Sequence, residues 1–266
     1  MHAIVCIKQV PDTTDVKINP ETNTLIREGV ASIINPFDTY AIEEGLRLKE
    51  RFGGKVTVIT MGPPQAREAL KEAIAMGADE AILLTDRAFA GSDTWATAYT
   101  LSQAIRRLAP FDIILCGKQA IDGDTGQVGP GIARQLQIPQ LTYVSRLVEI
   151  DPASARIRVE RLLEEGREIV DCTLPVLLTV VKDINQPRYP TFLGIRRATR
   201  IEIPVWDSQA LPEANPEYLG LKGSPTQVVR IFHPPARSGR ATLLTGDTPA
   251  QIAAQLADRL LADKVI

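Results

Sequence analysis

Residues 111–131, FDIILCGKQAIDGDTGQVGPG, set the architecture that the sequence predicts. They begin with an unbroken apolar run, Ile113 to Cys116, which is typical of a strand covered on both faces. A glycine-rich loop follows and leads into an expected helix. In an open α/β sheet, ligands bind where such loops leave the carboxyl ends of the strands, and glycines let backbone amides approach a phosphate. The same composition also suits an ordinary strand-to-helix turn, since Asp and Gly are common in turns.

Strands and helices alternate on the amino-terminal side of this loop. Apolar strands are expected at 2–7, 56–60 and 81–84, with helical periodicity between them. Asn35-Pro36-Phe37-Asp38 is typical of a helix start, with Asn35 as the N-cap, proline in the first helical position and an acid in the first turn. The alternation predicts a doubly wound, mostly parallel α/β sheet of the Rossmann-like type. Because the GxGxxG fingerprint is absent, any nucleotide is expected in the loops after the first, second and fourth strands.

The carboxyl-terminal half has a different pattern. Three extended segments between residues 147 and 172 predict an antiparallel excursion, and Pro175–Val181 predicts a strand that returns to the main sheet. Residues 185–245 show little periodicity, and a loop of that length is expected to wrap over a partner. Thr248-Pro249 predicts the start of a last helix with one apolar stripe. We therefore expect a nucleotide-binding domain at 1–184 and a partner-binding arm at 185–266.

Composition narrows the functional classes. The chain has 266 residues and a formal net charge of −2, which argues against nucleic-acid binding. Its three cysteines lie far apart in apolar runs, so we expect reduced core thiols, with neither a metal site nor a disulfide framework. No apolar stretch approaches the length of about 20 residues that spans a bilayer, and no signal-peptide pattern is present. A cytoplasmic protein without membrane insertion is expected.

Several separated motifs resemble one known family, the beta subunit of electron-transfer flavoprotein. The motifs that carry the resemblance are NPFD at 35–38 with AIEE at 41–44, AMGAD at 75–79, GKQAID at 117–122, RLLEEGRE at 161–168 with PVLLT at 175–179, and NQPRYP at 185–190. Each of these motifs is weak alone. Together they occur in order and at fitting intervals over nearly the whole chain.

The resemblance implies a heterodimer of alpha and beta subunits that transfers electrons. In the family, the alpha subunit carries an FAD, and the beta subunit binds an adenine nucleotide in the loops named above. That nucleotide is a structural AMP in ordinary members. In electron-bifurcating members it is a second FAD, which takes a hydride from NADH and divides the electrons between the alpha FAD and ferredoxin or flavodoxin. Acyl-CoA dehydrogenases or quinone-linked oxidoreductases are the further partners that the resemblance implies.

One segment distinguishes the two kinds of member. Ordinary members carry an acidic run that ends in Cys-Asn-Gln-Thr-Gly, whereas this chain has Asp122-Gly123-Asp124-Thr125-Gly126 and resembles the bifurcating type, as does its segment 220–226. Gly123 and Gly126 remove side chains where a pyrophosphate would pass, and Thr125 can donate to it. We expect FAD, with AMP as the alternative.

The resemblance and the loop chemistry give one set of candidate residues. The residues expected to bind the nucleotide are Cys6, Asn35, Pro36, Phe37, Asp38, Met61, Gly117, Lys118, Gln119, Ala120, Ile121, Asp122, Gly123, Asp124, Thr125, Gly126, Gln127 and Val128. Cys6 and Met61 also suit plain core packing, and Lys118 suits either a phosphate or solvent. Asp122 and Asp124 are expected to bond ribose hydroxyls or the backbone. No catalytic side-chain set is expected.

A second set is expected to dock electron-transfer partners. It comprises Arg188, Tyr189, Phe192, Arg196, Arg197 and Arg200, with Phe192 at the position of the family's apolar anchor. An apolar anchor ringed by charge suits a transient, electrostatically steered complex, whereas a solvated basic loop is the simpler alternative. A free-standing AMP- or ATP-binding regulatory module is a third reading of the chain, which the long arm after Asn185 disfavours.

Overall fold

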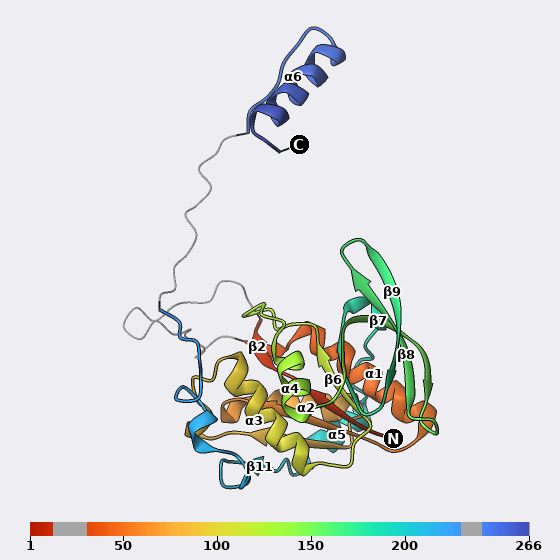
Figure 1. The fold of residues 1–266 in the computed structure, drawn as a ribbon, viewed down its shortest axis with the longest axis vertical. Helices are drawn as coiled ribbons and strands as arrows, with labels where there is room; N and C mark the ends of the chain where they lie inside the picture. Colours follow the sequence, from red (N-terminus) through yellow and green to blue (C-terminus); the bar gives the residue numbers. More distant parts are fainter. Residues whose placement is uncertain (13–30, 230–240, 266) are drawn as a thin grey trace. The chain divides into compact units, whose positions relative to one another are not determined.

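The computed structural model describes residues 1–12, 31–229 and 241–265 (Figure 1). The chain divides into two compact units, Met1–Val229 and Arg230–Ile266. The first unit holds the sheet and five of the helices named below, and the second holds one helix.

Within the described residues, the first unit is built on a nine-stranded sheet with the strand order β11-β5-β4-β1-β6-β10-β7-β8-β9. Its strands are β1 (His2–Cys6), β4 (Lys55–Met61), β5 (Glu80–Leu84), β6 (Ile113–Gly117), β7 (Gln140–Asp151), β8 (Arg156–Leu163), β9 (Gly166–Thr173), β10 (Val176–Val180) and β11 (Val205–Trp206). Neighbours from β11 to β7 pair in parallel, and β7, β8 and β9 pair antiparallel. A separate antiparallel pair joins β2 (Gln9–Pro11) to β3 (Ser32–Ile34). The predicted parallel sheet and antiparallel excursion are confirmed.

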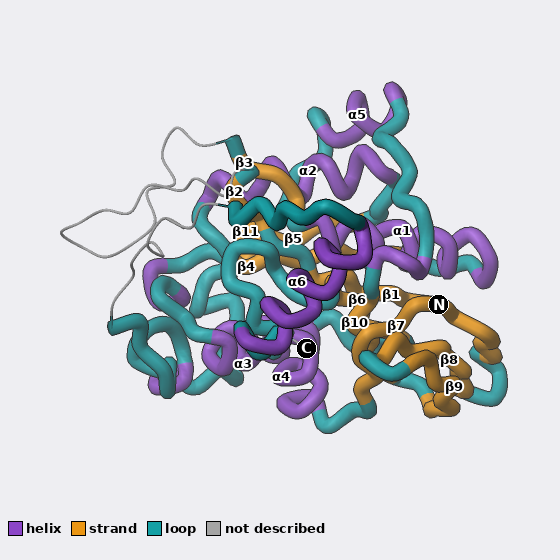
Figure 2. Tube along the Cα trace, turned by 90° about the horizontal axis from the view of Figure 1, so that it is seen from above, coloured by secondary structure: helices purple, strands orange, loops and turns teal. Residues whose placement is uncertain are grey.

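Helices cover both faces of the sheet. They are α1 (Pro36–Phe52), α2 (Arg67–Met76), α3 (Thr94–Arg107), α4 (Val128–Leu136) and α5 (Phe192–Ala198), with short 3-10 turns η1 (Pro64–Ala66), η2 (Arg87–Phe89), η3 (Lys182–Ile184) and η4 (Pro216–Tyr218). Figure 2 shows α1, α2 and α5 on one side of the strands and α3 and α4 on the other. Successive strand residues point to opposite faces, so Val5 packs with the α1 and α2 cluster, whereas Ile4 packs with the α3 and α4 cluster.

Residues 185–229 pack with the first unit, whereas the sequence placed the division at residue 184. Helix α5 packs on α2, and β11 extends the sheet beyond β5. The ring of Tyr218 packs edge-on against Trp95 and Tyr99 of α3. These elements are too short to show periodicity, since α5 has seven residues and β11 has two.

The second unit contains α6 (Pro249–Ala262), which begins as expected. The Thr248 hydroxyl accepts a hydrogen bond from the Gln251 amide at 3.3 Å and caps the helix. Leu256, on the expected apolar stripe, remains 48% exposed. In the described part of the chain, no helix has both the length and the apolar character that a bilayer crossing requires.

Candidate functional site

The direction of chain winding reverses between β1 and β6, and this places two loops side by side. From β1 the chain adds β4 and β5 on one side, and it then continues with β6 and β10 on the other. Cys6 and Cys116, near the carboxyl ends of β1 and β6, are paired in register. Such a reversal opens a crevice at the carboxyl edge of the sheet, which is the usual ligand position in this fold class.

A buried carboxylate ties the two loops together. Asp38, in the first turn of α1, accepts a hydrogen bond from the Lys8 amide at 2.7 Å on one oxygen. Its other oxygen accepts from the Gly117 amide at 3.2 Å and from the Asn35 side chain at 3.0 Å. A Cβ at position 117 would lie 2.3 Å from that oxygen, so the close approach requires glycine.

Asn35 makes the second connection, and it stands at the predicted N-cap position of α1 without the side-chain hydrogen bond that usually caps a helix. Instead, its amide group donates to the Gln119 carbonyl at 2.9 Å, and its side-chain oxygen accepts from the Ile121 amide at 3.1 Å. The side chain is occupied by the loop after β6, so it cannot satisfy the amides of its own helix as well.

The acids of this loop already have partners within the described chain. Asp122 forms an ion pair with the Lys8 ammonium at 2.6 Å, and Asp124 accepts from the Gln119 side chain at 2.7 Å. Neither requires a ribose hydroxyl to satisfy it. Lys8 was not among the predicted site residues. Its position just after the first strand, at the carboxyl edge of the sheet, could have indicated that it belongs to the site.

The loop ends in a set of free backbone donors. The amides of Thr125, Gly126 and Gln127 have no hydrogen-bond acceptor in the described residues. They lead into α4, whose N-terminus lacks a side-chain cap because the Gln127 side chain accepts from Thr94 instead. A Cβ at Gly123 would meet nothing within 4 Å. Open space beside free amides at a helix N-terminus suits an anion such as phosphate.

The predicted nucleotide-binding residues outside the loop after β6 lie at the end of β1, at the end of β4 and at the start of α1. Cys6 is buried in the α3 and α4 core cluster, and Met61 packs against the same cluster at the end of β4. Pro36 is exposed at the start of α1, and Phe37 is half-buried beside it. The core position of Cys6 fits the packing role, and hydrogen bonding to Cys6, followed by burial, raises the pKa of the Cys116 thiol.

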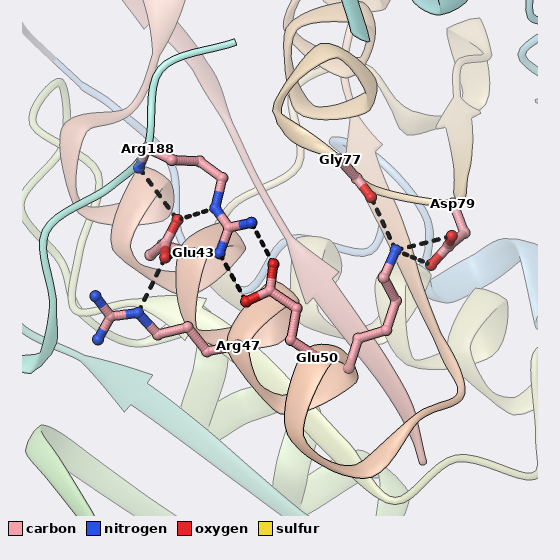
Figure 3. A network of polar contacts seen from close by, with 7 residues as sticks. Glu43, Arg47, Glu50, Gly77, Asp79 and Arg188 are labelled. Carbon is pink, nitrogen blue, oxygen red and sulfur yellow. Dashed lines mark hydrogen bonds and ion pairs between the residues drawn. The ribbon is translucent and has the colours of Figure 1, made fainter. Parts of the chain in front are cut away.

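The predicted docking residues divide into held and exposed side chains. Figure 3 shows the Arg188 guanidinium between two carboxylates of α1. It donates to Glu43 at 2.8 Å and also bonds Glu50. These hydrogen bonds raise the pKa of Arg188, and they help to lower the pKa of Glu43 although burial opposes this. Arg188 therefore anchors its segment to α1.

The segment after Arg188 is anchored a second time and is exposed between the anchors. Arg197 donates to the carbonyls of Ala78 and Asp79, at 3.1 and 2.8 Å. Between the anchors, Tyr189 is 91% exposed and Phe192 is 81% exposed. Arg196 and Arg200 line a shallow pocket next to Leu193. The structure thus presents exposed apolar side chains on a segment fixed at both ends.

Asp38 is expected to give the fold a specific pH dependence. Burial raises its pKa to about 7, against the lowering effect of the hydrogen bonds from Asn35, Lys8 and Gly117, whereas the ordinary value is 3.8. The folded chain therefore retains a proton that the unfolded chain releases, so this contribution to stability is present at low pH and is lost as the pH rises from about 4 to 7. The slope is at most about 1.4 kcal/mol per pH unit.

The measurement is urea unfolding of the wild type and of Asp38→Asn between pH 4 and 8. We expect the substitution to remove this component of the decline, because asparagine does not titrate. Parallel stability curves for the two proteins would contradict the assignment.

Comparison with known proteins identifies the family. Residues 22–211 match the electron transfer flavoprotein domain. The electron transfer flavoprotein subunit beta of Thermoanaerobacterium thermosaccharolyticum is 58% identical over 235 residues, which cover 88% of each chain. Protein FixA of Azotobacter vinelandii is 52% identical over 92% of this chain and 88% of its own. The caffeyl-CoA reductase-Etf complex subunit CarD of Acetobacterium woodii is 48% identical over 100% of both chains. The chain therefore belongs to the electron transfer flavoprotein family, together with proteins named as its beta subunits.

Proposed function

We propose that this chain is the beta subunit of a heterodimeric electron-transfer flavoprotein and that its loop at 117–128 binds FAD. The observation that supports this most directly is the row of free amides at 125–127 beside the open space at Gly123. An anionic diphosphate supplies the acceptors that these donors lack. The partnered acids nearby leave the edge less repulsive to an anion.

The chain's own residues position the nucleotide. Asp38 and Asn35 fix the start of the loop, so its later amides are held in place before the ligand arrives. Gly123 and Gly126 keep side chains out of the path of the diphosphate. An FAD held by these residues would supply the redox chemistry, namely hydride acceptance from NADH and one-electron transfer.

Electron bifurcation is the finer part of the proposal. The residues 122–130 resemble the bifurcating type, and the similar CarD carries the words "caffeyl-CoA reductase-Etf complex" in its name. We propose that one electron passes to the FAD of the alpha subunit, toward a dehydrogenase or quinone-linked acceptor. The other passes to ferredoxin or flavodoxin. A cytoplasmic location is part of the same proposal.

Two other functions are distinguished by specific features. An ordinary carrier would hold AMP in the same loop at 117–128, because AMP shares the adenylate phosphate with FAD. It would receive electrons from acyl-CoA dehydrogenases. A free-standing regulatory module that binds AMP or ATP needs no partner surface. The exposed apolar stripe of α6, where Leu256 is 48% exposed, favours a chain that is covered by an alpha subunit.

The cofactor content of the purified heterodimer tests the proposal. Two FAD per heterodimer are expected after denaturation and separation by chromatography. One FAD with one AMP would replace bifurcation with the ordinary carrier. A stable beta chain that purifies without flavin and without an alpha subunit would favour the regulatory module.

Gly123→Val is expected to expel the nucleotide of this subunit and to leave the alpha-subunit flavin in place. The valine meets no protein atom within 4 Å at its Cβ, so its side chain would occupy ligand space without disturbing the fold. We expect at least a roughly 100-fold weaker nucleotide affinity, about 2.7 kcal/mol or more. Ala153→Val, in the exposed turn between β7 and β8, is the matched control. Unchanged nucleotide content in Gly123→Val would move the diphosphate elsewhere.

We propose that the segment 188–197, which is anchored by Arg188 and Arg197, forms the docking surface for acceptor proteins together with Arg200. Its exposed Tyr189 and Phe192 can enter an apolar pocket of a partner, while Arg196 and Arg200 steer acidic surfaces toward it. Arg188 and Arg197 take a different part from the one expected, because they hold the segment against α1 and the turn after α2.

Phe192→Ala is expected to slow electron delivery to the acceptor about 10-fold without changing cofactor content, because it removes an apolar anchor from the interface. The measurement is the acceptor reduction rate at several acceptor concentrations, together with the flavin count. Val148→Ala, an exposed apolar position on β7, is the control. A rate equal to that of wild type would remove Phe192 from the docking surface.

A further inference from the structure

Lys118, in the loop after β6, carries a positive charge that no carboxylate of the described chain neutralises. The Lys118 ammonium lies 5.7 Å from the ring centroid of Phe37 and 5.2 Å from that of Tyr143. It has no hydrogen bond and no ion pair within the described residues. The nearest acids of its own loop are engaged elsewhere, since Asp122 pairs with Lys8 and Asp124 accepts from a glutamine. Aromatic faces attract the ammonium but leave its charge uncompensated.

Tyr143 occupies a backbone conformation that tyrosine rarely adopts. Its φ is +57°, in the left-handed region that favours glycine, although it lies within β7. Its amide donates to the buried Thr179 hydroxyl at 3.2 Å, which ties it to β10 at the carboxyl edge of the sheet. The ring nevertheless remains 42% exposed. This conformation falls where the register between β10 and β7 shifts, between the Leu178–Leu141 and Val180–Val144 pairs, and such irregularities re-aim side chains next to ligand sites.

The three side chains come from three different elements. Phe37 belongs to the start of α1, Lys118 to the loop after β6, and Tyr143 to β7. The Lys118 amide donates to the Val180 carbonyl at 2.9 Å, so its backbone is also fixed to β10. A lysine that is simply solvated needs neither a fixed backbone nor two flanking rings. This arrangement limits the orientations of the ammonium before any ligand binds.

We infer that Lys118, framed by Phe37 and Tyr143, is the phosphate-charge subsite of the nucleotide site, and that Tyr143 is its positioning residue. The inference rests on the proposed function, which places an adenine nucleotide in the loop after β6. The free amides at 125–127 supply hydrogen bonds, and Lys118 supplies the full positive charge that they lack. The two rings displace water from one side of the ammonium, which strengthens its attraction to a phosphate.

The test compares AMP with adenosine, which lacks the phosphate, on the full chain in its heterodimer after removal of bound nucleotide. Calorimetric titration should show that wild type prefers AMP. Lys118→Met should weaken AMP binding about 10- to 100-fold, the usual size for a lost charge-assisted contact, and leave adenosine binding unchanged.

Tyr143→Gly separates a positioning role from a structural one. Glycine adopts the positive φ without strain, so the Tm should stay within about 4 °C of wild type. AMP binding should nevertheless weaken about 5-fold or more, on the scale of a lost cation–π contact, and the AMP-over-adenosine preference should fall with it. Tyr143→Phe retains the ring and should bind AMP as wild type does. In the Lys118→Met background, Tyr143→Gly should have no further effect.

Two results would overturn the subsite. One is Tyr143→Gly with wild-type AMP affinity, and the other is an equal loss of AMP and adenosine binding. Gly123→Val keeps this failure distinct from failure of the proposed function. If that variant expels AMP while Tyr143→Gly does not weaken it, the nucleotide site stands and the subsite falls. A wild-type heterodimer that binds neither AMP nor FAD in this subunit would overturn both.

Discussion

The buried carboxylate of Asp38 holds the ligand side of the sheet together. It receives hydrogen bonds from the loop after β1, from the loop after β6 and from the residue that precedes α1. Without it, the Lys8 and Gly117 amides would be left without this acceptor in a partly buried place, which costs more than the bond itself contributes. The glycine at 117, the course of the later loop and the direction of α1 all depend on this one group.

This arrangement makes the proposed binding of an anion compatible with an acid-rich loop. Asp38 faces amide donors, Asp122 faces Lys8, and Asp124 faces a glutamine amide. Each acidic side chain is thus directed at donors of the protein, and burial keeps Asp38 partly protonated near neutral pH. Several donors of this loop lack a hydrogen bond within the described chain, among them the amides at 125–127 and the Lys118 ammonium. Local orientation therefore matters more here than the net charge of the loop.

The sequence predicted the sheet well because apolar runs and turn residues are local signals. The strand before Gly117, the helix that ends at Gly53 and the returning strand at Val176–Val180 all lie where expected. Short elements were missed, because two turns of α5 and two residues of β11 give no period to detect.

Side-chain partners were predicted least well. Asn35 is a residue type favoured at the N-cap, but besides Asp38 its side chain bonds a loop 84 and 86 residues away along the chain. Lys8 and Tyr143 reach the site only through strand neighbours that a single sequence does not reveal. Arg188 belongs to the expected basic segment, but its partners, Glu43 and Glu50, are about 140 residues earlier.

Helix α1 serves as a spacer between two parts of the molecule. Its first turn carries Asp38, which bonds the loops after β1 and β6, and its later turns carry Glu43 and Glu50, which bind Arg188. At 17 residues the helix is about 25 Å long, so helical geometry sets the separation between the cradle and the exposed Phe192 segment. One residue inserted between Asp38 and Glu43 would turn the two glutamates by about 100° and break this registration, although every side chain would still be present.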